Sequence, residues 1–114
     1  MMGRCSEELA EAAMTVGGCT PAFTYMFIEA LADGAVACGI PRPKAYEYAA
    51  ATMAGSAEMV LASGQHPGAL KDAVCSPGGS TIAGVRALEE GGFRAAAMNC
   101  VIAACQRNKE LGKQ

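Results

Sequence analysis

Alanine supplies 24 of the 114 residues, and this constrains the fold more than any other feature of the sequence. Alanine is the residue that α-helices favour most, whereas the β-branched and aromatic residues typical of strands are sparse. The 14 glycines lie mainly where one predicted segment gives way to the next. We therefore expect an all-α fold, and an all-β fold is close to excluded.

Length and charge narrow the class of protein further. A chain of 114 residues fits one domain, since domains run roughly 100–200 residues. A chain of this size hides only about two thirds of its unfolded surface, so we expect it to present a large apolar surface to a partner. The net charge is −2 and the nine Lys and Arg residues are scattered, so we expect no nucleic-acid partner.

Neither a membrane helix nor a secretory signal is expected. The longest stretch without charge, residues 12–28, contains two glycines, a proline and three threonines, and it is shorter than the ~20 apolar residues that a span needs. The segment Met1-Met2-Gly3-Arg4 lacks the apolar region and cleavage site of a secretory signal. We expect a cytoplasmic protein.

The six cysteines are interpreted as small apolar residues of a helical core. An even number could form a disulfide framework in a secreted chain, but nothing else indicates secretion. No pair has the C-x-x-C spacing, and Cys100 and Cys105 would not share a helix face, so no metal site is expected.

Glycines and prolines divide the chain into a predicted bundle of about six helices. Ser6 begins a first helix over residues 6–14. A break at residues 17–21 follows, in which Thr20 caps and Pro21 opens a second helix that reaches about Cys38. The remaining helices are expected over residues 42–62, 67–74, 82–90 and 93–111.

Three of these helices carry apolar positions at the three-and-four spacing of one face. Such stripes of small residues indicate close helix–helix contact more often than a cofactor site. In the second helix, Glu29 and Asp33 lie four residues apart and could serve as paired carboxylates, although a solvated helix flank is the simpler interpretation. The stripes are Phe23, Phe27, Ala30, Leu31, Gly34 and Cys38; Tyr48, Ala51, Thr52, Gly55, Met59 and Ala62; and Phe93, Ala96, Ala97, Cys100, Val101 and Ala104.

The segment 76–81 is the strongest candidate for chemistry. Its two glycines let successive backbone N–H groups point into one concavity at the N-terminus of the next helix, which is where anions bind. Ser76, Ser80 and Thr81 add hydroxyl groups. No lysine follows in the order of a P-loop, which favours a carboxylate over a phosphate. The alternative is a capping turn in which Ser80 satisfies the first N–H groups of the helix.

Around this loop the chain resembles the C-terminal domain of pyrroline-5-carboxylate reductase. The resemblance covers about Cys5 to Leu111, and the motifs follow one another in the family's order. They are Glu29-Ala30-Leu31-Ala32-Asp33-Gly34, Gly39-Ile40-Pro41-Arg42, His66-Pro67, Leu70-Lys71-Asp72, Ser76-Pro77-Gly78-Gly79-Ser80-Thr81-Ile82-Ala83-Gly84 and Leu88-Glu89-Glu90-Gly91-Gly92-Phe93-Arg94.

The resemblance implies an oxidoreductase that reduces 1-pyrroline-5-carboxylate to L-proline with NADPH or NADH. In the family a Rossmann domain precedes the helical domain, but no Gly-x-Gly-x-x-Gly follows a strand here. We therefore expect residues 1–114 to be a single helical dimerisation and substrate-binding domain, the separated C-terminal half of such an enzyme. It would not bind the nucleotide tightly or transfer hydride alone.

The resemblance also assigns roles to residues of the loop. Ser76 and the backbone around Gly78, Gly79, Ser80 and Thr81 would bind the substrate carboxylate, and the Thr81 hydroxyl would lie near the ring nitrogen as the catalytic group. Where the family has Ser-Gly-Ser-Gly-Pro-Ala, this chain has Gly17-Gly18-Cys19-Thr20-Pro21-Ala22. The position of this segment in the family implies a contact with substrate or nicotinamide. The residues that would make it are Gly18, Cys19, Thr20 and Pro21.

The resemblance further implies an interleaved homodimer, which in the family often assembles into rings. The alternative is a helical dimerisation module that kept the fold without a working site. A related dehydrogenase domain would need a catalytic lysine on its long helix, and Lys44, at a helix start, does not suit that role. His66 could donate a proton to the imine, but its place before Pro67 favours a local role in a turn.

Overall fold

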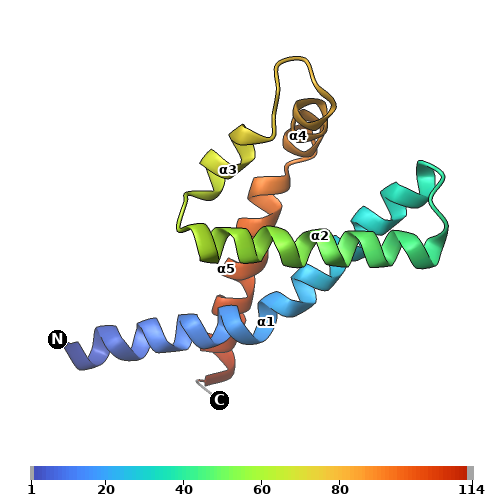
Figure 1. Cartoon of the computed structure of the whole chain (residues 1–114). Helices are drawn as coiled ribbons and strands as arrows, with labels where there is room; N and C mark the ends of the chain where they lie inside the picture. The colour runs from blue at the N-terminus through green and yellow to red at the C-terminus, as the bar shows by residue number, and fades with distance from the viewer. Residues whose placement is uncertain (1, 113–114) are drawn as a thin grey trace. The chain divides into compact units, whose positions relative to one another are not determined.

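The computed structural model describes the backbone of residues 2–112 and the side chains of residues 6–112. Within this range the chain forms five α-helices and no strand (Figure 1). The all-α prediction is therefore confirmed. The helices are α1 (Met2–Ala37), α2 (Arg42–Ser63), α3 (Pro67–Ala73), α4 (Ser80–Glu90) and α5 (Phe93–Gly112).

The predicted break at residues 17–21 is wrong, because α1 continues through it. Pro21 lies inside the helix, and Thr20 is a helical residue instead of a cap. The two helices expected on either side are one, which gives five helices where about six were expected. A proline removes a single N–H donor, and the good helix formers before and after this segment supply the remaining hydrogen bonds.

The other helices lie close to their predicted positions. Gly39, with φ +102°, follows the end of α1, and Gly64, with φ +67°, caps α2 by donating its N–H to the carbonyl of Val60 at 3.2 Å. Only glycine adopts such values without strain, which is why these two residues end their helices. Helix α4 begins at Ser80, two residues before the predicted start.

The helices form two compact units. The central unit is the continuous segment 27–91, with the last part of α1 and all of α2, α3 and α4. The end unit combines α1 up to Met26 with α5, from Gly92 onward. Helix α1 thus contributes to both units.

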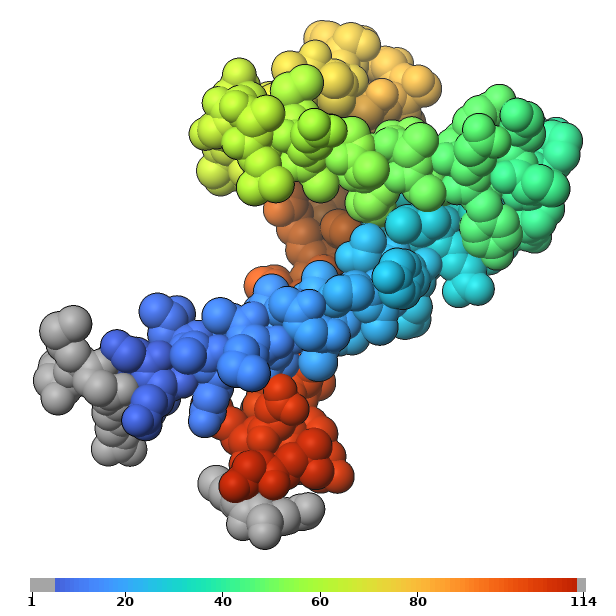
Figure 2. Space-filling view, turned by 60° about the horizontal axis from the view of Figure 1, so that its bottom comes forward, coloured from blue at the N-terminus to red at the C-terminus, as the bar shows by residue number. Residues whose placement is uncertain are grey.

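Alanine methyl groups make the core of the central unit. Ala32 of α1 and Ala45 and Ala49 of α2 are its buried apolar residues, and half-buried Ile28 and Val36 pack around them. The two helices lie against each other, as the cyan and green surfaces show (Figure 2). Small side chains at the contact let helix axes approach closely.

A charged cluster joins the end of α1 to the start of α2. Arg42 donates a hydrogen bond to Asp33, and its guanidinium lies 5.7 Å from the ring centroid of Tyr46. The hydrogen bond to Asp33 raises the pKa of Arg42 above its ordinary value, so this residue stays cationic. Asp33 is thus half of an exposed ion pair, and sequence reasoning missed its partner.

A buried polar contact joins α1 to α5 in the end unit. The hydroxyl of Thr15, which is 4% exposed, donates to the carbonyl of Glu11 at 3.0 Å and accepts from the amide nitrogen of Asn108 at 2.5 Å. Buried polar groups that are paired in this way fix the register of two helices, because breaking the pair leaves an unsatisfied group.

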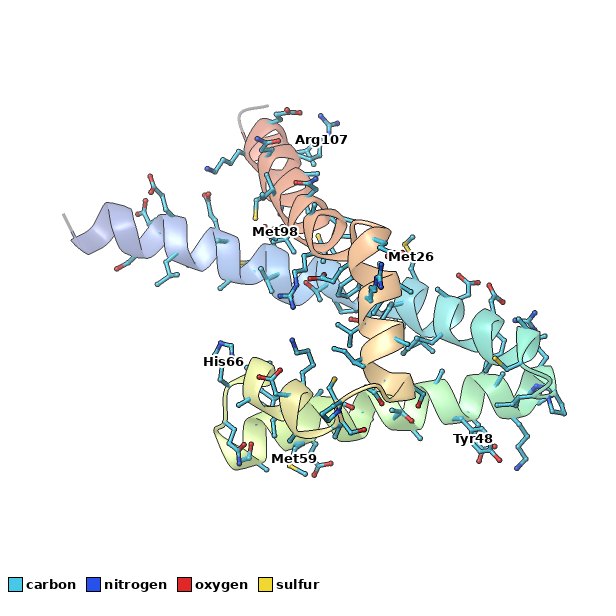
Figure 3. All side chains as sticks on the ribbon, turned by 90° about the horizontal axis from the view of Figure 1, so that it is seen from above. Met26, Tyr48, Met59, His66, Met98 and Arg107 are labelled. Atoms are coloured by element: carbon cyan, nitrogen blue, oxygen red, sulfur yellow. The ribbon has the colours of Figure 1, made fainter. Side chains whose placement is uncertain are left out.

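The predicted apolar stripe of α2 is not the face that packs on α1. All six of its residues are exposed, whereas Ala45 and Ala49 lie on another face of the helix. Tyr48 and Met59 project from the same side of α2 (Figure 3). The stripe predicted for the second helix is also shifted, since Ala32 is buried while Ala30, Leu31 and Gly34 are exposed.

Candidate functional site

The predicted anion loop begins where α3 ends. The N–H of Cys75 donates to the carbonyl of Asp72 at 3.1 Å, and the N–H of Gly79 then donates to the carbonyl of Ser76 at 3.1 Å. Gly78 has φ +71°, and Pro77 precedes it. Proline second and a glycine of positive φ third are the features of a type II turn. The sequence therefore folds residues 76–79 into a tight turn directly before α4.

The N-terminus of α4 carries no side-chain cap. Its N-cap residue is Gly79, with φ −82° and ψ 176°, and no side chain accepts a cap hydrogen bond there. Helix geometry leaves the first N–H groups, including those of Ser80 and Thr81, without an intrahelical acceptor. The alternative in which Ser80 itself caps the helix is thus wrong, because Ser80 is the first residue inside it.

The hydroxyl of Ser76 lies against this N-terminus. A Cβ atom built on Gly79 would stand 2.6 Å from Ser76 Oγ and 3.2 Å from the Ser76 carbonyl oxygen. Ser76, Ser80 and Thr81 are exposed, and Gly79 is half-buried. The loop therefore combines hydroxyl groups, free helix amides and the positive end of a helix dipole, which together suit a small carboxylate.

The second predicted site segment lies in the other unit. Gly18, Cys19, Thr20 and Pro21 belong to α1 in the end unit, whereas the loop belongs to the central unit. Cys19 is half-buried, and the Thr20 hydroxyl oxygen is buried without a hydrogen-bond partner among the described residues. Being helical, this segment exposes no row of backbone N–H groups.

His66 has the local role that its position before Pro67 favours. Its Nδ1 accepts a hydrogen bond from the N–H of Gly68 at 2.9 Å, which caps α3. It lies at the start of that helix (Figure 3). This cap was not predicted, because histidine is not among the usual N-cap residues.

The described cysteines are free thiols, namely Cys19, Cys38, Cys75, Cys100 and Cys105. Four are half-buried and Cys38 is exposed, so the expectation that cysteines fill a core is wrong for Cys38 and too strong for the others. Among side chains 6–112, no group of His, Cys, Asp and Glu residues could hold a metal ion. Nor does any described helix have an apolar run long enough to cross a bilayer.

Fold and loop together define an all-helical domain in which a tight turn precedes a helix N-terminus without a side-chain cap. The sequence model of the pyrroline-5-carboxylate reductase dimerisation family matches residues 7–111. The chain belongs to this family.

Curated relatives agree with the family match. The chain is 51% identical over 108 residues to pyrroline-5-carboxylate reductase of Escherichia coli strain K12, which covers 95% of this chain and 40% of that protein. It is 50% identical over 110 residues to the Arabidopsis thaliana enzyme, covering 96% of this chain and 40% of the relative. This chain therefore spans about two fifths of the length of the relatives it matches.

A solved structure shares the fold as well. Pyrroline carboxylate reductase of Plasmodium falciparum, crystallised with NADP bound, superimposes with a TM-score of 0.87 at 40% identity. The superposition covers 93% of this chain and 40% of that one. The helical architecture therefore occurs in a member of the same enzyme family.

Proposed function

We propose that this chain is the dimerisation and substrate-binding part of a reductase that converts 1-pyrroline-5-carboxylate to L-proline with NADPH or NADH. Family membership and the uncapped loop at residues 76–81 support this proposal. The single observation that carries the substrate site is the set of free amides at the start of α4, with Ser76 Oγ beside Gly79.

The role of the loop follows from the charge of the substrate. Ser76 and the N–H groups of Ser80 and Thr81 would hold the carboxylate, and the Thr81 hydroxyl would meet the ring nitrogen. The N–H of Gly79, which the resemblance also assigns to the carboxylate, donates instead to the Ser76 carbonyl within the turn. Fixing the ring in this way orients its imine carbon, and orientation is what a protein contributes to a hydride transfer. Gly78 contributes its backbone conformation, which sets the turn.

The nucleotide is proposed to bind mainly to residues outside this chain. Dinucleotides are held by a strand, a glycine-rich loop and a helix, whereas residues 2–112 form helices only. We therefore assign this chain a part in substrate binding and expect it not to bind the nucleotide tightly by itself. The cysteines that the structure describes are free thiols, and free thiols are typical of a reducing compartment. This supports the proposal of a cytoplasmic location.

Pairing of two copies is proposed from the exposed apolar surface. Leu61 is 85% exposed and Met59 is 55% exposed, although both are apolar residues of α2. The small-residue stripe around Met59 is likewise uncovered. Such a surface marks an interaction site, and a homodimer is the simplest closed assembly that covers it. We further propose that such dimers can assemble into rings.

A non-catalytic dimerisation module is the second candidate function. The observation that favours it is the altered segment 18–21, where Thr20 has a buried, unpartnered hydroxyl inside a helix. Fusing residues 1–114 behind the nucleotide-binding domain of the Escherichia coli relative separates the two candidates. Imine reduction by a correctly assembled fusion supports the reductase, and no turnover favours the module.

The carboxylate site is tested on the chain itself by amide NMR. Adding L-proline is expected to shift the N–H signals of Gly79, Ser80 and Thr81. Pyrrolidine, which has the same ring without the carboxylate, is the matched control and is expected to leave them unchanged. Equal responses to both compounds, or shifts confined to other residues, would contradict the proposed site.

A further inference from the structure

Helix α1 has a weak stretch in its interior, at residues 17–21. Gly17 and Gly18 are not among the glycines of positive φ, and a Cβ on either would meet no other helix within 4 Å. Neither backbone conformation nor packing therefore requires glycine at these positions. Pro21 has no N–H, so the carbonyl of Gly17 lacks the donor that the helix would otherwise supply. Glycine and proline are the residues that helices favour least, so this stretch weakens α1 locally.

The part of α1 before this stretch is anchored to α5. Thr15 is 4% exposed, and its hydroxyl accepts a hydrogen bond from the side chain of Asn108. The same hydroxyl donates to the carbonyl of Glu11 one turn earlier. A buried polar pair resists separation, because parting its members leaves an unsatisfied group. The front of α1 is therefore held to α5.

The part of α1 after the stretch is anchored to a different helix. Ala32 is buried together with Ala45 and Ala49 of α2, and Ile28 and Val36 of α1 pack around them. Small side chains at such a contact bring two helices close together, so the rear of α1 is held to α2. The weak stretch thus lies between two anchored halves of one helix, and each half has its own partner.

The chain enters α5 through a second pair of glycines. Gly91 follows the end of α4, and Gly92 has φ +77°. The boundary between the two compact units falls between these two residues. Glycine has the widest range of backbone conformations of any residue. Movement of α5 together with the front of α1 therefore meets no continuous helix at this end.

We propose that residues 17–21 are a hinge in α1, at which the half bound to α5 and the half bound to α2 change their mutual angle. Sharp changes of helix direction arise at proline and glycine, and Figure 1 shows that α1 changes direction in its blue portion. The Thr20 hydroxyl oxygen is buried without a hydrogen-bond partner among the described residues, so opening this turn breaks no side-chain bond of Thr20.

The hinge itself is independent of the proposed reaction. Its consequence for that reaction rests on the proposed function, because the hinge would set the position of residues 18–21, for which the family pattern implies a contact with substrate or nicotinamide. The tests of the hinge therefore contain no ligand. Failure of L-proline to bind would contradict the proposed function and leave these tests unaffected.

The first test is amide hydrogen exchange of the whole chain, measured by NMR. After correction for intrinsic rates, exchange at Cys19, Thr20 and Ala22 is expected to be about tenfold faster than at residues 12–15 and at residues 29–32. A helix that only frays from its N-terminus would instead lose protection steadily from residue 32 toward residue 6. That pattern, or equal protection across residues 12–32, would overturn the hinge.

The second test separates a hinge from a rigid bend. Residual dipolar couplings are measured for the amides of residues 6–15 and of residues 24–36. Two independent alignment tensors are expected, because the two halves of α1 reorient separately. A single tensor that fits both halves would mean a fixed bend, and the proposal would be wrong.

Glycine variants provide a matched control. Gly18→Ala should slow exchange at residues 17–22 by about four- to fivefold, the helix preference of alanine over glycine, and Pro21→Ala should slow it by about tenfold or more. Gly34→Ala makes the same change in the same helix, also where a Cβ meets nothing within 4 Å, and should leave residues 17–22 unchanged. Equal effects of Gly18→Ala and Gly34→Ala on residues 17–22 would count against the hinge.

Discussion

At the scale of single residues, the two adjacent glycines of the candidate loop are present for different structural reasons. Gly78 is required by its backbone, because φ +71° strains any residue with a side chain. Gly79 has φ −82° and ψ 176°, which any residue adopts, but a Cβ there would stand 2.6 Å from Ser76 Oγ, so a side chain at this position requires the hydroxyl to move. The sequence motif shows two equal glycines, and only the structure separates their roles.

Substituting Gly79→Ala is therefore expected to displace the Ser76 hydroxyl while leaving the fold intact. Affinity for L-proline should fall by about ten- to a hundredfold, in line with the roughly 1.5–3 kcal/mol of a hydrogen bond to a charged group. Calorimetry or NMR titration measures the loss. Gly84→Ala is the control, since a Cβ there has no atom within 4 Å, and its affinity should stay unchanged. Equal affinity in both variants would refute the role of Ser76.

At the scale of elements, α1 shows the limit of reading glycine and proline as breaks. Gly17, Gly18 and Pro21 together cost about 5 kcal/mol of helix propensity relative to alanine, yet the helix continues. Tertiary contacts of α1 compensate for this cost, among them the pair of Thr15 and Asn108 and the buried Ala32. Because Asn108 lies 93 residues away in the sequence, no local pattern could have revealed that contact.

Replacing the interior proline should stabilise the helix. Pro21→Ala restores one backbone N–H and removes the ring from the helix interior, so the free energy of unfolding should rise by about 1–3 kcal/mol. Pro43→Ala is the control, because Pro43 stands in the first turn of α2, where the missing N–H is not needed. Thermal and denaturant unfolding compare the two variants. A destabilised Pro21→Ala protein would show that the proline is required.

Helix positions were predictable from sequence to within a few residues, apart from this break, but helix faces were not. Alanine occurs on every side of α2, so the three-and-four spacing fits several stripes equally well. The structure buries Ala45 and Ala49 and leaves Ala51 and Ala62 exposed. The loop at residues 76–81 was predictable because glycine, proline and serine have specific conformational roles there. The absence of a side-chain cap on α4 was not predictable, because the identity of the N-cap residue depends on the backbone dihedral angles.

The two alanine faces of α2 should respond differently to a larger side chain. Ala45→Leu is expected to force α1 and α2 apart and cost about 1–3 kcal/mol, because Ala45 is fully buried. Ala51→Leu should leave the stability of the central unit unchanged, since Ala51 is exposed, and affect only self-association. Circular dichroism during unfolding, combined with sedimentation velocity, distinguishes the effects. Similar unfolding of both variants would mean that the buried face is misassigned.

At the scale of the whole molecule, the balance between buried and exposed apolar residues is unusual for a stable monomer. Among side chains 6–112 the buried apolar residues are three alanines, whereas Leu9, Tyr25 and Leu61 are at least 69% exposed. Burial of a leucine contributes about 1.5–3 kcal/mol, so these side chains could stabilise an assembly far more than they stabilise one chain. Stability should therefore depend on protein concentration.

A charge in the small-residue stripe of α2 tests the proposed dimer. Met59→Glu should raise the dimer dissociation constant by about tenfold or more, because an unpaired charge at an interface is costly. Ala54→Glu adds the same charge on another side of α2 and should leave the constant unchanged. Sedimentation equilibrium measures both. A wild-type protein that stays a folded monomer at micromolar concentration would contradict the pairing itself.

The pairing of the chain's first and last helices in one unit bears on how the protein forms during synthesis. Residues 27–91 are contiguous, so the central unit has all its parts once that segment has left the ribosome. Thr15 emerges early, but its partner Asn108 is made 93 residues later. Until α5 has been made, the part of α1 that precedes Phe27 lacks its packing partner, and its apolar side chains stay uncovered. Chaperones bind nascent chains in this state.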